Sequence, residues 1–222
     1  MNRLTTLTQL HEKLQKHLDE QSKNWESFIY AQQKGFYQGF DEIKIDGCRP
    51  TEKRFKRYNI EKYLSKDKSS LDIGCNCGFF SLFVSKFLNT VTGVEINPYL
   101  VSIANDTKNF LKINNTEFVS SKFEELKTDK KFDIVFSFAN DSTIDDNTEF
   151  NFKEYIQKIL SLLKDDGILI FESQAIDAII PQKFEPKMKI LEELFTILEN
   201  RKVESEYPLN VPERIFLVLQ KK

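Results

Sequence analysis

The sequence is poor in the residues that form several common kinds of site. Its two histidines, His11 and His17, both lie near the N-terminus. The three cysteines are an odd number, and Cys75 and Cys77 are too close for an ordinary disulfide. No four-ligand zinc spacing is present. We therefore expect neither a disulfide framework nor a bound metal, and a histidine base is not available in the C-terminal half.

The chain also lacks long apolar runs and any excess of positive charge. No stretch approaches the roughly 18 apolar residues that cross a bilayer. The N-terminal sequence MNRLTTLTQLHEKLQKHLDE has no apolar signal region. The net charge of -2 gives no general basic surface for nucleic acid. We predict a cytoplasmic protein without a membrane span, and we do not expect nucleic acid as its partner.

What is present suits one sizeable α/β domain with an extension. Hydrophobic residues make up 40% of the 222 positions and charged residues 30%, an ordinary globular composition. At the N-terminus, helical spacing predicts a helix over about residues 4–33, with five leucines on one face: Leu4, Leu7, Leu10, Leu14 and Leu18. We predict a helical extension over 1–64, serving as a lid or a homodimer contact, and a main domain over 65–222.

From about residue 69, short apolar runs alternate with helical stretches. The predicted strands are 70–73, 90–95, 117–120, 132–138 and 167–172. The predicted helices between them are 79–88, 99–113 and 149–163. A helix over 187–200 and two strands, 202–207 and 214–220, follow. This pattern predicts a doubly wound, seven-stranded, mostly parallel sheet with an antiparallel strand near the C-terminus.

The segment SLDIGCNCGFF reads as a strand, a glycine turn and a helix start. Gly74 and Gly78 remove side chains where the backbone approaches a ligand, and the helix N-terminus offers unpaired N–H groups. Glu95 ends the next strand, some twenty residues further on. A carboxylate at that position can accept hydrogen bonds from two neighbouring ribose hydroxyls. Together these residues predict a nucleoside-binding site.

Four segments taken in order, LDIGCNCGFFSL, VTGVEINPYLV, FDIVFSFAND and LLKDDGILIFES, resemble the motifs of class I S-adenosylmethionine-dependent methyltransferases. The resemblance covers about residues 69–174. It implies S-adenosyl-L-methionine as the cofactor. The residues implied to bind it are Asp72, Gly74, Asn76 and Gly78 at the methionine part, Glu95 with the adjacent Ile96 at the ribose, and Lys122 and Phe123 at the adenine. Asn76 departs from the family, which commonly has glycine there.

The upstream segment GCRPTEKRF is similar to methyltransferases of bacterial surface-polysaccharide clusters. That resemblance implies that Arg54, with Tyr37 and Gln38, approaches the carboxylate of the cofactor. A guanidinium suits this role because it binds a carboxylate through two parallel hydrogen bonds. The resemblance to surface-polysaccharide methyltransferases also implies a small-molecule or glycan acceptor. Specifically, it implies O-methylation of a sugar or sugar phosphate in capsule or lipopolysaccharide synthesis.

Methylation of a hydroxyl benefits from a base, and we look for one where the strands end. Asp141, after the fourth strand, is our first choice for the base or for a group that orients the acceptor, and Glu172, at the end of the fifth, is the second. As an alternative, the two carboxylates could hold a divalent cation. Asn140 and Arg49 are the predicted acceptor-binding residues.

Other functions stay open on the sequence alone. A tRNA or other small-molecule methyltransferase has a similar glycine turn. A nicotinamide-dependent oxidoreductase shares the plan of strand, turn, helix and acid, but its G-x-G-x-x-G pattern is broken here by Asn76 and by Phe79 and Phe80. A non-catalytic cofactor-binding protein is a third alternative.

Overall fold

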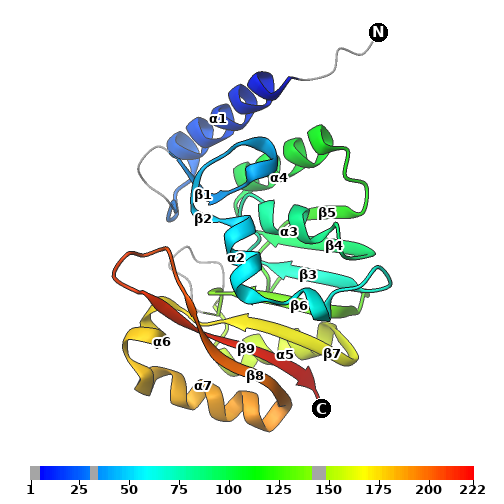
Figure 1. Ribbon diagram of the computed structural model, residues 1–222, viewed down its shortest axis with the longest axis vertical. Helices are drawn as coiled ribbons and strands as arrows, with labels where there is room; N and C mark the ends of the chain where they lie inside the picture. Colours follow the sequence, from blue (N-terminus) through cyan, green and yellow to red (C-terminus); the bar gives the residue numbers. More distant parts are fainter. Residues whose placement is uncertain (1–5, 31–34, 142–148) are drawn as a thin grey trace.

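The computed structural model describes residues 6–30, 35–141 and 149–222. Its main sheet has seven strands in the order β5-β4-β3-β6-β7-β9-β8 (Figure 1). The strands are β3 (Ser69–Ile73), β4 (Thr90–Glu95), β5 (Thr116–Ser120), β6 (Phe132–Phe138), β7 (Leu163–Glu172), β8 (Phe195–Glu204) and β9 (Glu213–Lys221). Neighbours from β5 to β7 are parallel, whereas β9 runs antiparallel to both β7 and β8. The predicted fold class is therefore confirmed.

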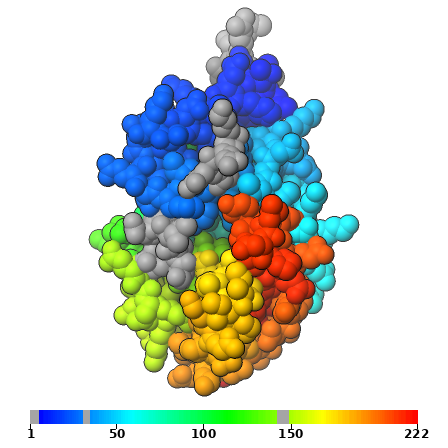
Figure 2. All heavy atoms as spheres, turned by 90° about the vertical axis from the view of Figure 1, so that its left-hand side faces the viewer, coloured from blue at the N-terminus to red at the C-terminus, as the bar shows by residue number. Residues whose placement is uncertain are grey.

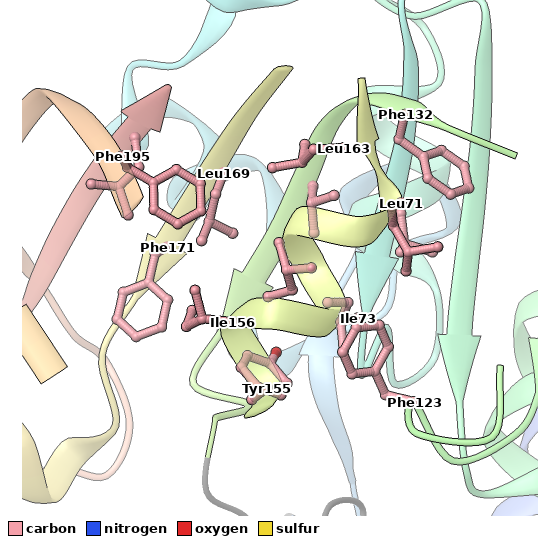
Figure 3. Close-up of a cluster of buried hydrophobic side chains, with 14 of the residues drawn as sticks. Leu71, Ile73, Phe123, Phe132, Tyr155, Ile156, Leu163, Leu169, Phe171 and Phe195 are labelled. Carbon is pink, nitrogen blue, oxygen red and sulfur yellow. The ribbon is translucent and has the colours of Figure 1, made fainter. Parts of the chain in front are cut away.

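Apolar side chains are buried on both faces of this sheet. The helices beside it are α2 (Thr51–Tyr58), α3 (Phe79–Val84), α4 (Pro98–Leu111), α5 (Phe152–Leu162), α6 (Ala175–Ile179) and α7 (Pro181–Leu194). On one face, Tyr155 and Ile156 of α5 pack with Leu71 and Phe171 of the sheet (Figure 3). On the other, α2 and α3 pack against β6 and β7. The sheet is covered on both sides, which explains why its central strands are nearly continuous apolar runs.

The N-terminal part combines a helix with a small second sheet. Helix α1 (Leu7–Asn24) leads to a parallel pair, β1 (Phe36–Gly39) and β2 (Gly47–Pro50). Short 3₁₀ turns span Asp41–Ile43 and Glu61–Tyr63. In Figure 1, α1 lies at one end of the molecule, beyond β1 and β2.

Helix α1 is fixed to α4 rather than projecting freely. Leu10 and Leu14 are buried in a cluster that includes Ile103 of α4. Lys13 and His17 both contact the Asp106 carboxylate, at 2.6 and 2.8 Å. These apolar and polar contacts hold α1 against α4.

Several predicted boundaries are wrong, and two of the differences change how a segment is read. The first helix ends at Asn24, with Trp25 already extended, although apolar residues continue beyond it. The helix predicted over 187–200 ends at Leu194, and Phe195–Glu204 is strand β8. Residues of β8 pair with β9 along the sheet edge, so sheet pairing overrides the local helical pattern there. Among the described residues, no helix is long and apolar enough to cross a membrane.

Candidate active site

The turn between β3 and α3 has three residues with left-handed backbone: Gly74 (φ 62°), Asn76 (φ 55°) and Gly78 (φ 70°). A Cβ on Gly74 would lie 2.6 Å from Oδ1 of Asn140, and one on Gly78 would lie 2.7 Å from the Cβ of Ala104. Both glycines are therefore required by conformation and by space. Asn tolerates the left-handed region better than most residues, which is why Asn76 can replace the expected glycine.

Gln38 of β1 connects the N-terminal part to this turn. Its Nε2 donates to the carbonyl of Cys75 at 3.2 Å, and its Oε1 accepts from the backbone N–H of Phe79 at 3.0 Å. The second bond satisfies one of the orphan donors at the start of α3. Gln38 therefore fixes the shape of the turn from outside it.

Glu95 lies beside the turn at the end of β4. Its Oε2 accepts from the backbone N–H of Asn76 at 2.9 Å, and its Oε1 accepts from that of Asn97 at 3.0 Å. These bonds fix the orientation of the carboxylate, which lines the cavity described below. A carboxylate oxygen can accept more than one hydrogen bond, so both oxygens retain capacity for ligand hydroxyls.

Asp72, the fourth residue of β3, is buried and accepts a 2.5 Å hydrogen bond from Oγ of Ser81. Burial raises the pKa of this carboxyl to about 6, and the Ser81 hydrogen bond and the charge of Arg54 oppose that rise. A cation that binds near Asp72 would lower the pKa of this carboxyl, because a positive charge favours its ionised form.

These groups share one cavity of about 290 Å³ at the carboxyl ends of β3, β4, β6 and β7. Its lining residues are Phe28, Tyr30, Tyr37, Gln38, Arg49, Arg54, Asp72, Gly74, Asn76, Phe80, Glu95, Phe138, Ala139, Asn140, Gln174, Ala175, Tyr207, Pro208 and Arg214. Figure 2 views the molecule from the side on which the blue N-terminal residues, the red β8–β9 connection and the yellow residues near α6 come together. Ligands of doubly wound sheets bind at this edge.

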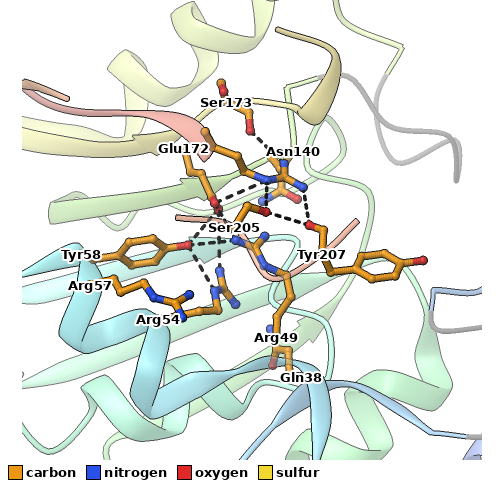
Figure 4. Close-up of polar contacts among 12 residues, drawn as sticks. Gln38, Arg49, Arg54, Arg57, Tyr58, Asn140, Glu172, Ser173, Ser205 and Tyr207 are labelled. Carbon is orange, nitrogen blue, oxygen red and sulfur yellow. Dashed lines mark hydrogen bonds and ion pairs between the residues drawn. The ribbon is translucent and has the colours of Figure 1, made fainter. Parts of the chain in front are cut away.

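Three arginines of the lining converge on Glu172, the last residue of β7 (Figure 4). The Glu172 carboxylate is fully buried and lies 2.5 Å from Nη2 of Arg49, 3.7 Å from Nε of Arg214 and 4.0 Å from Nη2 of Arg54. Tyr58 also donates to it at 2.8 Å. Burial would raise the pKa of Glu172, but the arginine charges outweigh it and hold the pKa below its usual value.

Comparison with known proteins identifies the family to which this fold belongs. A family model described as a methyltransferase domain matches residues 64–210, more than half of the chain. The chain belongs to the methyltransferase domain family. The expectation of an S-adenosylmethionine-dependent methyltransferase is thus confirmed at the level of family and fold, and the oxidoreductase alternative is set aside.

Similar proteins differ widely in what they methylate. Malonyl-[acyl-carrier protein] O-methyltransferase of Acetivibrio thermocellus is 25% identical over 162 residues, covering 72% of this chain and 48% of that protein. The 23S rRNA (uracil(1939)-C(5))-methyltransferase RlmD of Francisella tularensis subsp. novicida is 29% identical, covering 48% of this chain and 27% of that protein. This methyltransferase domain therefore spans half or less of the length of these relatives.

Among solved structures, the N-methyltransferase NodS of Bradyrhizobium japonicum, in complex with S-adenosyl-L-homocysteine, has a TM-score of 0.60 at 16% identity. The match covers 96% of this chain and 98% of that one, so it includes the N-terminal part. At this identity, the likeness supports the fold.

The cavity of the methyltransferase domain fits S-adenosylmethionine chemically. The glycine turn leaves backbone exposed where a Cβ would intrude, the Glu95 carboxylate can accept hydrogen bonds from hydroxyls, and the Arg54 guanidinium offers a positive charge that suits a carboxylate. Oδ1 of Asn76 is buried without a hydrogen-bond partner among the described residues. An unpaired acceptor at this position suits a ligand donor.

Most residues predicted to bind cofactor line the cavity: Tyr37, Gln38, Arg54, Asp72, Gly74, Asn76 and Glu95. Gly78, Ile96, Lys122 and Phe123 do not appear in the lining. Phe123 is 1% exposed and packs edge-on against Tyr155 in the core, and Lys122 pairs with Glu149 at 3.3 Å. Neither of these last two side chains lines the cavity, and an adenine contact in this loop, by backbone or side chain, stays a prediction.

The two predicted bases also lie outside the lining, whereas the predicted acceptor residues Asn140 and Arg49 are part of it. Asp141 is buried and paired with Lys187, whose Nζ lies 2.5 Å from it and 2.8 Å from Asp177. Burial raises the pKa of Asp141, which Lys187 opposes. These contacts favour a positioning role for Asp141, and the three arginines favour one for Glu172, so their service as bases stays a prediction.

Sequence reasoning found Tyr37 but missed Arg214 and the other rings of the aromatic row, Phe28, Tyr30 and Tyr207. Rings of Phe28 and Tyr30 are 5.0 Å apart, Tyr30 and Tyr37 5.1 Å, and Tyr37 and Tyr207 5.8 Å, measured between centroids. These four rings come from segments almost 180 residues apart in sequence. Phe28 carried a signal, because it continues the apolar pattern past the end of α1, but that signal indicated a helix.

Proposed function

We propose that this methyltransferase domain transfers the methyl group of S-adenosylmethionine to a hydroxyl of a sugar or sugar-phosphate acceptor. The observation that supports this acceptor best is the row of aromatic rings from Phe28 to Tyr207, beside the amides of Asn140 and Gln174. Aromatic rings offer an apolar face to the C–H face of a sugar, and amides bond to hydroxyls. A role in capsule or lipopolysaccharide synthesis rests on the resemblance of the segment containing Arg49 and Arg54.

When bound, the cofactor supplies an activated methyl group, so the protein mainly aligns the acceptor and excludes water. Glu95 would hold the ribose, and Arg54 the methionine carboxylate. Asp72 would lie near the methionine ammonium, whose charge would favour ionisation of this carboxyl. The aromatic row would hold the acceptor on the far side of the transferred methyl.

A methyl-transfer assay tests this proposal. The purified chain is incubated with radiolabelled S-adenosylmethionine and four acceptor classes: neutral sugars, sugar phosphates, nucleotide-linked sugars and unmodified tRNA. We expect label in one of the sugar classes. Label in tRNA alone would overturn the acceptor assignment, as would label in a malonyl-[acyl-carrier protein] added as a fifth class. Failure to bind S-adenosylhomocysteine by titration calorimetry would overturn the function as a whole.

A further inference from the structure

Three arginines and three carboxylates lie in and beside the cavity, so their charges balance before any ligand binds. Arg49, Arg54 and Arg214 are at most 4% exposed and share Glu172. Asp72, near Arg54, and Glu95 are the carboxylates of the cavity lining. Glu95 is held by the backbone N–H groups of Asn76 and Asn97. Three guanidinium groups therefore face three carboxylates, and the charges of these side chains balance.

Cofactor binding makes this balanced site positive. The amino-acid part of S-adenosylmethionine has one carboxylate and one ammonium, and its sulfonium adds a further positive charge. A buried cation without a counterion is costly. A filled site of this kind therefore calls for one more anion, and the acceptor is the component that can bring it.

Arg49 has the unused donors for such an anion. Its Nη2 donates to Glu172 and Tyr58. Among the described residues, its Nη1 has no acceptor, and its Nε is buried and unpaired. The Arg49 side chain lines the cavity and is 2% exposed. Buried guanidinium N–H groups rarely lack partners, so the unpaired Nε indicates a missing acceptor group.

The other two arginines are committed to different tasks. The Arg54 guanidinium lies 5.4 to 5.5 Å from the ring centroids of Tyr58, Phe80 and Phe138, on the side of the glycine turn. Arg214 donates to Oγ of Ser205 and to the carbonyls of Ser173 and Tyr207, at 2.9 to 3.1 Å. Arg214 thus contributes charge and fixes the β8–β9 connection, whereas Arg49 retains donors.

We propose that the acceptor carries an oxyanion, a phosphate or a carboxylate, that binds Arg49 while Arg54 holds the carboxylate of the cofactor. This inference rests on the proposed function and narrows it, because a neutral sugar would leave Arg49 unpaired. The anion would set the orientation of the acceptor against the aromatic row.

The test uses the full chain saturated with S-adenosylhomocysteine and two probes, inorganic phosphate and acetate, with chloride at matched ionic strength as the reference. Binding is measured by titration calorimetry and by the shift in Tm. We expect saturable binding of at least one probe, and the stronger probe identifies the class of anion. Arg49→Gln should weaken that binding about tenfold or more, the loss expected for charge-assisted hydrogen bonds. Arg57→Gln, which removes an arginine outside the lining, should not change it.

Arg49→Lys is a second variant for the case that Arg49→Gln does not fold, because lysine keeps a positive charge beside Glu172. It should bind S-adenosylhomocysteine like the wild type but bind the anion more weakly, because lysine lacks the planar fork. Two results would overturn the inference: no saturable anion binding to the loaded wild type, or equal binding by the wild type and both Arg49 variants. If the wild type does not bind S-adenosylhomocysteine at all, that result would instead overturn the proposed function.

Discussion

The two walls of the cavity are built in different ways. The wall with Asp72, Gly74, Asn76 and Glu95 comes from 24 consecutive residues, and its groups are held by backbone hydrogen bonds and left-handed turns. The second wall joins the segment after α1, strand β1 and the β8–β9 connection through ring contacts. Backbone geometry tolerates little change, whereas side-chain contacts can be replaced. We infer that the first wall serves a constant ligand and the second a variable one.

Glu95→Ala should have the largest effect and act on the first wall alone. Two ribose hydrogen bonds to a carboxylate contribute about 3 kcal/mol, so we expect the affinity for S-adenosylhomocysteine to fall roughly 100-fold. Titration calorimetry measures it. The control is Glu117→Ala, a carboxylate on β5 that pairs with Lys130 outside the cavity. Unchanged affinity in Glu95→Ala would remove the assigned ribose contact.

Asp72 should make stability fall as pH rises from about 4 to about 6. The folded carboxyl has its pKa raised to about 6, against 3.8 as the ordinary value, so in this window the folded state holds a proton that the unfolded state has lost. Relative to Asp72→Asn, the wild type should lose on the order of 2–3 kcal/mol across the window. Urea unfolding at several pH values measures the difference. Asp129→Asn, at an exposed carboxylate, should not reproduce it.

The variant Gly74→Ala tests whether glycine is needed in the first wall because of backbone strain or because of steric overlap. Alanine at φ 62° is strained and overlaps Asn140, so we expect a loss of about 2 kcal/mol in the free energy of unfolding. The double variant Gly74→Ala/Asn140→Ala removes the overlap and keeps the strain. It should be less destabilised than the sum of the two single variants, and strict additivity would contradict the steric contact.

Tyr207→Ala should have the smallest effect and act on the second wall. Loss of one aromatic contact costs about 0.5–1.5 kcal/mol, so we expect KM for the acceptor to rise roughly threefold to tenfold. The affinity for S-adenosylhomocysteine should stay unchanged, and Tyr207→Phe should behave like the wild type because it keeps the ring. A parallel loss of cofactor affinity in Tyr207→Ala would show that the walls are not independent.

The difference between the walls also explains what the sequence could predict. The strands 90–95 and 132–138 were predicted at their observed bounds, and Gly74 and Glu95 were found, because strand periodicity and turn chemistry are local. Phe28 and Tyr207 line the same cavity only because of the fold, and no local pattern relates them. Arg214 was missed for the same reason, since its partners Ser173 and Tyr207 belong to other segments.

The boundaries of α1 and β8 were missed for a related reason. Residues 195–204 take their conformation from pairing with β9, and Trp25 ends α1 although its own segment has helical spacing. Asp141 and Glu172 were found at strand ends, but their partners Lys187 and Arg49 lie 46 and 123 residues away. A carboxylate at a strand end can be recognised from the sequence, whereas the basic residue that forms an ion pair with it cannot.

The Gln38 amide has a consequence for how the N-terminal part communicates with the rest of the molecule. Because one side chain bonds to both Cys75 and Phe79, a displacement of β1 would alter the first turn of α3 at the same time. A molecule that docks on the outer end of the protein could therefore tune affinity for the methyl donor without entering the cavity. Removing residues before β2 would abolish this link, so shortened versions of the chain should bind the donor less well even where they fold.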